Sequence, residues 1–336
     1  MRTTSRLTAA AVLFAAFTLV YNLKAQQLVT IETVTVGDAG NAADTTIAGF
    51  GAVADVFAIG KYEVTIGQYT TFLNAVAATD TYSLYNPGMT TDQNVAGITR
   101  AGSSGSFSFS AIGSDNRPIT YVSWFGAARF ANWMNNGATT GASTETGAYT
   151  LNGATSGIIT KNEGATWWIP AEDEWYKAAY YKSGGTNAGY WRYPTQSDLA
   201  PGNTIGGTPN LANYYNGVYS VTQSGDYSSS TNYLTDTGEF SGSASAYNTY
   251  DQGGNVWEWN DAVVDDSTRG LRGGAWRYDG QGINYLQASI RGHYDPTLEF
   301  GSVGFRLASV PEPSAYALLL LAGAGWLLWK RRKATL

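Results

Sequence analysis

Few side chains in this 336-residue sequence could carry out nucleophilic or acid–base chemistry. His293 is the only histidine and cysteine is absent, so thiol chemistry is excluded. Any Ser-His-Asp arrangement or imidazole metal site would have to use His293. A His-Glu-x-x-His zinc helix is impossible, and no glycine-rich phosphate loop followed by Lys-Ser/Thr is present. We interpret His293 as a polar loop residue rather than a catalytic one.

Three consecutive carboxylates, Glu172, Asp173 and Glu174, are the next candidates for chemistry. They could supply a general acid–base pair. They also follow Pro170, a residue that suits the first position of a helix, and helix N-termini favour acidic side chains. We favour the second interpretation, in which the three residues begin a helix.

The elements that must position such residues are short. Thr65 is predicted to cap a helix through Leu73, and Ser123 is predicted to cap a helix over residues 124–135. Residues 28–36 and 57–65 read as strands. The Gly/Ser/Thr/Asn-rich stretches 138–160 and 183–246 are predicted to be long surface loops. With 40 glycines, 23 tyrosines and only 14% charged residues, the composition indicates a loop-rich α+β protein.

Both ends of the chain read as processing signals. Arg2 and Arg6 precede an apolar run, which makes residues 1–25 a predicted signal peptide. At the other end, Pro-Glu-Pro at 311–313 leads into a predicted transmembrane helix over 315–329 and a basic cluster that would stay cytoplasmic. A plain C-terminal membrane anchor would also have this order. Residues 310–336 resemble the PEP-CTERM sorting signals of Gram-negative bacteria, which implies processing by an exosortase and release to the cell surface or extracellular matrix.

Charge narrows the range of partners. Without its two ends the chain is more acidic, because residues 26–309 carry a formal net charge of −12 against −6 for the whole. Nucleic acid is an unsuitable partner, since phosphate binding requires a cationic face. Cations and neutral sugars remain compatible with this charge. Because no disulfide can form, stability must come from the core, and a bound metal ion could add to it.

Five motifs in a fixed order resemble those of the formylglycine-generating enzyme family, also called sulfatase-modifying factors. They are I-G-K-Y-E-V-T at 59–65, P-I-T-Y-V-S-W at 118–124, W-I-P-A-E-D-E-W-Y at 168–176, G-N-V-W-E-W at 254–259 and R-G-G-A-W at 272–276, followed by G-F-R at 304–306. The resemblance implies one irregular, C-type-lectin-like domain over residues 28–308. It departs from the family at Trp168 and Ala171, where Arg and Thr are usual.

The resemblance also implies a structural calcium ion. Carried over by position, the ligands of a first site would be Asp251 and Glu258 with the backbone of Gly254 and Val256. A second site would fall on Asn213, the backbone of Tyr214, and Asp226. Oxygen ligands of this kind suit Ca²⁺. The alternative is that Asp251 and Glu258 only hold a turn by hydrogen bonds.

The catalytic residues of the resembled family are missing. Its two copper-binding cysteines would fall at Tyr278 and Ile283, and Cu(I) requires soft thiolate ligands, so no copper is expected. Related members use a three-histidine iron site, which one histidine cannot form.

The sequence therefore predicts an exported, non-catalytic binding or structural module. Its partners would be the sorting machinery, the membrane before processing, and an extracellular polysaccharide or a surface protein. The expected ligand-binding surface consists of exposed residues suited to stacking and hydrogen bonding, namely Trp276, Arg277, Tyr278, Asp279, Asn284, Tyr285 and Tyr294. The alternative is an enzyme with an unrecognised chemistry, such as hydrolysis through carboxylates, which would require a pocket that gathers two carboxylates rather than an aromatic floor.

Overall fold

The computed structural model describes residues 27–46, 49–277 and 282–311. The predicted signal peptide, the Pro-Glu-Pro segment beyond Pro311 and the predicted helix 315–329 lie outside these residues. Within the described part of the chain, no helix has the length and apolarity needed to cross a membrane.

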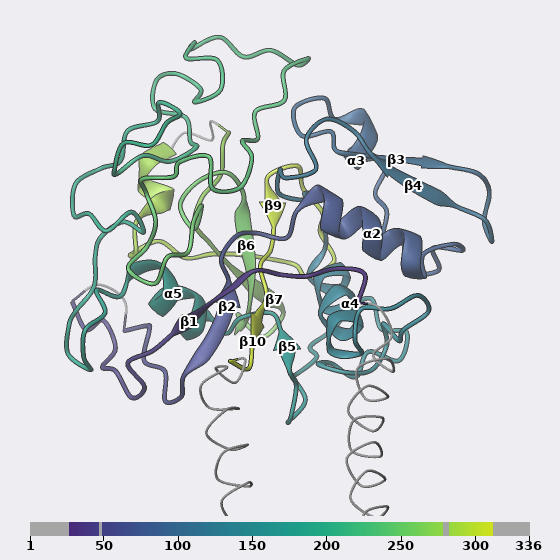
Figure 1. Ribbon diagram of the computed structural model, residues 1–336, viewed down its shortest axis with the longest axis horizontal. Helices are drawn as coiled ribbons and strands as arrows, with labels where there is room; N and C mark the ends of the chain where they lie inside the picture. Colours follow the sequence, from purple (N-terminus) through teal and green to yellow (C-terminus); the bar gives the residue numbers. More distant parts are fainter. Residues whose placement is uncertain (1–26, 47–48, 278–281, 312–336) are drawn as a thin grey trace, which may run out of the picture.

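The first sheet joins the two ends of the described chain. Its order is β1-β2-β10-β5 and all its neighbours are antiparallel. Ala308 in the last strand pairs with Ile59 on one side and Trp168 on the other, so the closing segment is held in the middle of the sheet (Figure 1). The strands are β1 (Thr33–Val36), β2 (Phe57–Gly60), β5 (Trp167–Trp168) and β10 (Ala308–Ser309).

The second sheet has the order β8-β7-β6-β9, in which only the β6–β9 pair is parallel. A register shift between Trp259 and Val263 interrupts the β6–β7 ladder, as a bulge does. Its strands are β6 (Trp257–Val264), β7 (Thr268–Arg272), β8 (Gly292–Tyr294) and β9 (Val303–Gly304). A separate hairpin consists of β3 (Ile98–Ala101) and β4 (Ser108–Ala111).

The helices confirm the predicted caps. Thr65 and Gln68 form a reciprocal capping box at the start of α2, and the Ser123 hydroxyl accepts a hydrogen bond from the Gly126 N–H at the start of α4. The third predicted helix begins two residues later than Pro170, because the Glu174 carboxylate accepts from the Ala171 N–H and places the cap there. The elements are α2 (Ile66–Val76), α3 (Gly88–Thr91), α4 (Trp124–Asn135), α5 (Glu172–Tyr180) and the 3-10 helix η1 (Gly282–Leu286).

An aromatic core packs between α2, α4 and the first sheet. Phe72 of α2 lies 5.2 Å from Phe130 of α4 between ring centroids, and Phe130 lies 5.5 Å from Phe305. All three side chains are buried. The predicted mixed, loop-rich α and β fold is confirmed, and tertiary packing of aromatic rings holds its short elements together.

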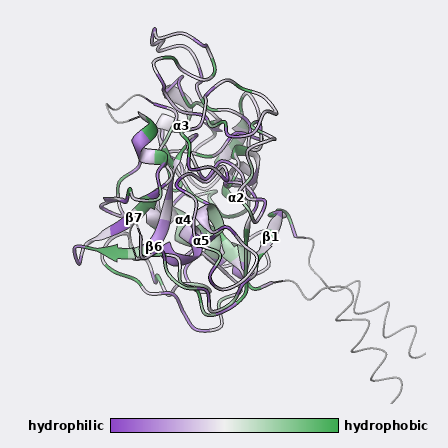
Figure 2. Ribbon diagram, turned by 90° about the vertical axis from the view of Figure 1, so that its left-hand side faces the viewer, coloured by the Kyte–Doolittle hydropathy of each residue, from purple (hydrophilic) through white to green (hydrophobic). Residues whose placement is uncertain are grey.

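The predicted strands and loops need two corrections. Only 33–36 and 57–60 of the two predicted strand segments pair in a sheet. The long segment between α5 and β6, teal to green in Figure 1, lacks helices and strands as predicted, but it is not purely a surface loop. It buries Tyr193, Tyr214 and Tyr233. Figure 2 accordingly shows hydrophobic residues distributed in short stretches over loops as well as over regular elements.

Candidate ligand-binding cleft

Three aromatic rings stack in a tier beside the second sheet. Tyr233 lies parallel to Trp276, with 5.0 Å between ring centroids and 5° between planes. Tyr227 also stacks on Tyr233, with 6.0 Å between ring centroids and 14° between planes. Tyr227 is 58% exposed whereas Tyr233 and Trp276 are buried, so the tier leads from the core to the solvent. Such a stack presents a rigid, half-apolar face.

The turn after β7 places Trp276 in the tier. Gly273 and Gly274 have φ of 102° and 75°, which side chains with a Cβ rarely adopt. The backbone N–H of Trp276 then donates to the Asn255 carbonyl (3.0 Å), and its indole N–H donates to the Gly301 carbonyl (3.3 Å). The R-G-G-A-W motif therefore fixes the position of one aromatic ring.

Polar side chains surround this tier. The Tyr121 hydroxyl donates to Asp92 Oδ2 (2.7 Å), and burial with this bond raises the pKa of Tyr121 far above its usual value. Asn94 accepts from the Tyr227 hydroxyl and donates to two carbonyls, which fixes its orientation. Arg277 is exposed and has no ion pair among the described residues. Together these residues line a hollow of about 280 Å³, which we call the aromatic cleft.

A second hollow of about 280 Å³ lies between β6, β7 and β8. Trp257 and Tyr285 meet edge to face there, with 5.1 Å between ring centroids. Tyr294, 46% exposed, also lines this hollow. His293 belongs to strand β8 and not to a loop, because its backbone pairs with Gly270. Its Nδ1 lies 3.1 Å from the Thr268 hydroxyl, so the imidazole is held by a neighbouring strand.

The predicted ligand-binding surface is split between these two hollows. Arg277 and Trp276 line the first, while Tyr285 and Tyr294 line the second. Trp276 is wrongly predicted as exposed, because the stack with Tyr233 and the bond to Gly301 bury all but 5% of it. Asn284 is exposed on η1, and the predicted residues Tyr278 and Asp279 lie outside the described residues.

The sequence reasoning did not identify several residues of the aromatic cleft. Tyr219 and Tyr227 belong to a segment that the sequence predicts to be a surface loop. Asp92 and Asn94 follow a helix of four residues, which is too short to show a periodic pattern in the sequence. The available signal was the recurrence of tyrosine in a stretch otherwise rich in Gly, Ser and Thr. Tyrosines that recur in a loop can supply rings for stacking without forming a helix or a strand.

A buried ionic centre surrounds Arg306. Its guanidinium forms a bidentate pair with Glu258 (2.6 and 2.7 Å) and donates to the Tyr250 carbonyl (2.8 Å). Glu258 also accepts from the Trp175 indole (2.7 Å). Arg306 and Glu258 are both fully buried, so the pair requires this geometry to offset the cost of desolvation. The last arginine of the G-F-R motif thus meets the glutamate of G-N-V-W-E-W.

Two further carboxyl groups, Glu63 and Asp251, belong to this ionic centre. Burial and repulsion from Asp251 raise the pKa of Glu63 well above its usual value. Burial likewise raises the pKa of Asp251 to about 6, although Asp251 Oδ2 accepts from the Gly238 N–H (2.5 Å). With Glu258 there are three acids around the single guanidinium of Arg306, so the centre has an excess of acidic groups.

The first predicted calcium set is brought together only in part. Asp251 lies at the ionic centre, and Gly254 and Val256 follow it along the chain, but the Glu258 carboxylate is occupied by Arg306 and Trp175. Glu258 as arranged does not fit a calcium ligand. Among the described residues, no three His, Asp or Glu side chains converge so as to hold a metal ion. Calcium therefore stays a prediction that rests on Asp251 and on the excess of acidic groups.

The second predicted set is more dispersed. The Asn213 side chain is buried and donates to the Tyr233 carbonyl (3.0 Å) and to Asn255 Oδ1 (3.0 Å). The Tyr214 carbonyl accepts from the Ser220 hydroxyl (3.1 Å). Asp226 is exposed. The polar groups of Asn213 and Tyr214 are thus used in hydrogen bonds within the protein in this arrangement.

The carboxylates of α5 have a structural role beyond capping. Glu172 pairs with Arg272 (2.7 Å) and with Arg291 (2.7 Å), which ties the helix to the second sheet. Asp173 accepts from the Gly51 N–H (2.7 Å). Their placement at the helix start is confirmed.

Another hollow, of about 510 Å³, gathers carboxylates. Glu63, Glu32 and Asp115 line it. Glu63 is 2% exposed and its Oε2 has no hydrogen-bond partner, whereas Glu32 forms an exposed pair with Lys61 (2.8 Å). We call this the acidic hollow. It meets the condition set above for the enzymatic alternative, since it holds more than one carboxylate.

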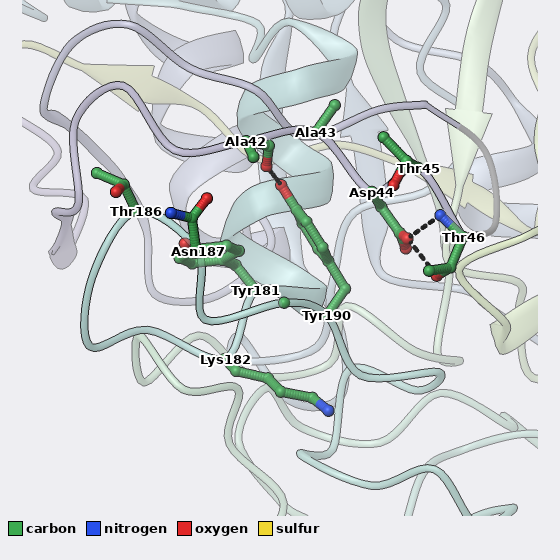
Figure 3. Close-up of a pocket in the computed structure, with 11 residues that line it drawn as sticks. Ala42, Ala43, Asp44, Thr45, Thr46, Tyr181, Lys182, Thr186, Asn187 and Tyr190 are labelled. Atoms are coloured by element: carbon green, nitrogen blue, oxygen red, sulfur yellow. Dashed lines mark hydrogen bonds between the residues drawn. The ribbon is translucent and has the colours of Figure 1, made fainter.

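Figure 3 shows a further hollow of about 340 Å³ beside α5. The Tyr190 hydroxyl points at the Ala42 carbonyl and donates to it (2.7 Å). Asp44 turns onto Thr46, accepting from its hydroxyl (2.6 Å) and its N–H (3.1 Å). These polar groups are bonded to the protein itself, so this hollow has less to offer a ligand than the aromatic cleft.

Of the two positions that would hold catalytic cysteines, the structure describes only Ile283. Ile283 packs against a buried cluster that contains Leu286, and Tyr278 lies outside the described residues. The described chain around the aromatic cleft supplies one carboxylate, Asp92, and no imidazole. What it offers is stacking and hydrogen bonding.

Comparison with known proteins agrees with the motif order. Residues 24–310 match the family model of the sulfatase-modifying factor enzyme 1-like domain. The chain is similar to the crystal structure of CarF, at 21% identity and a TM-score of 0.49, over 84% of this chain and 99% of that one. Treponema denticola variable protein 1 has 18% identity and a TM-score of 0.45, over 84% and 95% of the two chains. PvdO from Pseudomonas aeruginosa has 17% identity and a TM-score of 0.43, over 84% and 93%. No curated protein matches the chain.

Proposed function

This chain belongs to the family of sulfatase-modifying factor enzyme 1-like domains, and from that premise we propose that it is an exported, non-catalytic member that acts as a binding module. The aromatic cleft is the proposed binding site. The observation that carries this proposal is the tier formed by Tyr227, Tyr233 and Trp276, whose exposed member, Tyr227, lines the cleft together with Asp92 and Arg277.

The loss of the family reaction follows from ligand chemistry. A copper oxidase of this type needs two thiolates, and the whole sequence has no cysteine. A histidine-ligated iron site needs more imidazoles than the single His293. The expected result is that the protein, incubated with copper, oxygen and a Cys-x-Pro-x-Arg peptide, yields no aldehyde by mass spectrometry. Turnover above a no-protein control would contradict the non-catalytic proposal.

Binding through the cleft can be tested by capture. Full-length protein purified in detergent would be immobilised and exposed to envelope polysaccharides and surface proteins of the producing cells. Tyr227→Ala should lose the captured ligand, whereas Leu199→Ala should retain it. Leu199 is the matched control because it is 76% exposed and lines neither aromatic hollow. Equal capture by wild type and Tyr227→Ala would place binding elsewhere.

We also propose export and processing of the tail. The Pro-Glu-Pro segment, the apolar stretch and the basic end support sorting to the surface or matrix. Intact-mass measurement of surface or medium fractions should then find a form that lacks residues 315–336. A full-length protein confined to the inner membrane would instead identify the tail as a plain anchor.

The acidic hollow supports a second candidate function, hydrolysis through carboxylates. Glu63, whose raised pKa favours the protonated carboxyl, would be the proton donor, and Asp115 would be the base. Hydrolysis of a panel of glycoside and ester substrates that Glu63→Gln abolishes would favour this candidate. Absence of hydrolysis with intact capture by the aromatic cleft would favour the binding module.

A further inference from the structure

We propose that the aromatic cleft and the second hollow are two subsites of one path for a neutral polysaccharide chain. The inference rests on the proposed binding function and specifies its ligand. It also adds the hollow between β6, β7 and β8, which the aromatic cleft alone does not require.

The two hollows share a wall of aromatic contacts. Phe300 lines the aromatic cleft and Tyr294 lines the second hollow, and their ring centroids are 5.2 Å apart. Trp257 lines the second hollow and packs against the buried cluster that contains Trp276. The contact between Phe300 and Tyr294 therefore joins the walls of the two hollows.

The side chains that line the path suit sugar rings. Each hollow has one strongly exposed tyrosine, Tyr227 or Tyr294, whose ring can cover the apolar C–H face of a pyranose. Asp92 and Arg277 in the first hollow can hydrogen-bond to hydroxyl groups at the ring edge. At about 280 Å³ each, the hollows admit small rings rather than a folded surface.

The charge of the protein favours a neutral polysaccharide over an anionic one. Residues 26–309 carry a net charge of −12, which repels a polyanion at a distance. The first hollow holds Asp92 as well as Arg277, and Arg291 in the second hollow is already paired with Glu172. Among the described residues of the two hollows, Arg277 is the arginine without an ion pair, and a single such cation does not form a cationic strip.

A length series tests the path with full-length protein in detergent. Calorimetry would measure dissociation constants for neutral glucan and mannan oligosaccharides of increasing length, with an anionic uronate polymer as comparison. We expect oligomers to bind about tenfold or more tightly than the monosaccharide, because the second contact becomes intramolecular. Tyr227→Ala should weaken all of them. Tyr294→Ala should weaken long oligomers only, and Leu199→Ala none; unchanged circular dichroism would verify the fold of each variant.

The outcomes separate this inference from the proposed function. Binding that does not tighten with length, or that Tyr294→Ala leaves unchanged for long oligomers, would overturn the two-subsite path and keep the cleft. Preference for the uronate polymer, or capture only of a surface protein, would overturn the neutral polysaccharide. Failure to bind any sugar or protein through Tyr227 would reject both the inference and the binding module.

Discussion

The ionic centre around Arg306 consists of buried charged side chains, whereas the aromatic cleft is lined mainly by uncharged aromatic rings. Arg306 and Glu258 are fully buried charges held by several hydrogen bonds, and both belong to motifs shared with the family. Tyr227 and Tyr233 are uncharged rings from a loop outside those motifs. The motifs therefore supply the buried ionic centre and the fixed wall of the cleft at Trp276, whereas its exposed rings come from a loop that can vary without changing the fold.

Substitutions in the two regions should therefore affect different properties of the protein. Changes at the ionic centre should alter the free energy of unfolding and disturb binding only through the fold. Changes in the aromatic cleft should alter binding and leave the fold almost unaffected.

Breaking the central ion pair should have the largest effect. Glu258→Ala removes the bidentate partner of the buried Arg306 guanidinium and the acceptor of the Trp175 indole, which costs about 3–5 kcal/mol of unfolding free energy. Urea unfolding would measure the loss. Glu32→Ala is the matched control, because its pair with Lys61 is exposed and is worth less than about 1 kcal/mol. Equal losses for the two variants would contradict the distinction between core and surface charges.

Calcium should have the next largest effect if it offsets the acidic excess of the ionic centre. Free Ca²⁺ at about 100 times its dissociation constant would stabilise the native state by about 2.7 kcal/mol. We expect Ca²⁺ to raise the melting temperature of the wild type and not that of Asp251→Asn. Asp226→Asn separates the second predicted set, since it should leave the rise intact if the ion lies beside Asp251. If the wild type gave the same melting curve in Ca²⁺ and in chelator, the calcium proposal would be rejected.

The free energy of unfolding should fall as the pH rises, because of Glu63 in the same ionic centre. Because burial raises the pKa of Glu63 well above its usual 4.5, the native state binds this proton more tightly than the unfolded state does. The contribution of Glu63 is complete below pH 4.5 and is lost as the pH rises through its native pKa. Urea unfolding at a series of pH values should show this fall, and Glu63→Gln should flatten it. An unchanged slope in Glu63→Gln would mean that Glu63 does not carry the proton.

Local signals in the sequence predict the helix starts well. Thr65 and Ser123 accept hydrogen bonds within their own first turns, so the cap residue and its partner are neighbours in the chain. The motif order also predicts the fold and the family. The strands are predicted less well, because β5, β9 and β10 have two residues each and exist only through pairing with distant segments.

The aromatic cleft is the part that the sequence predicts least. Trp276 belongs to a motif, but its stacking partner Tyr233 lies in another part of the chain and follows no periodic pattern. Nor does sequence position reveal that Glu258 would be occupied by Arg306 instead of being available to a metal. Both outcomes depend on contacts between segments far apart in the chain, which local propensity does not determine.

The smallest expected change in stability, at Tyr227, is the most direct test of the comparison. Tyr227 is 58% exposed, so Tyr227→Ala should cost less than about 1 kcal/mol of unfolding free energy even though it removes a ring stacked on Tyr233. Tyr227→Phe keeps that ring and removes only the hydroxyl that donates to Asn94. If stacking carries recognition, Phe should retain the captured ligand and Ala should lose it, with both variants melting within a few degrees of the wild type. A large fall in melting temperature for Tyr227→Ala would instead make the tier part of the fold, and the separation between a structural centre and a binding cleft would fail.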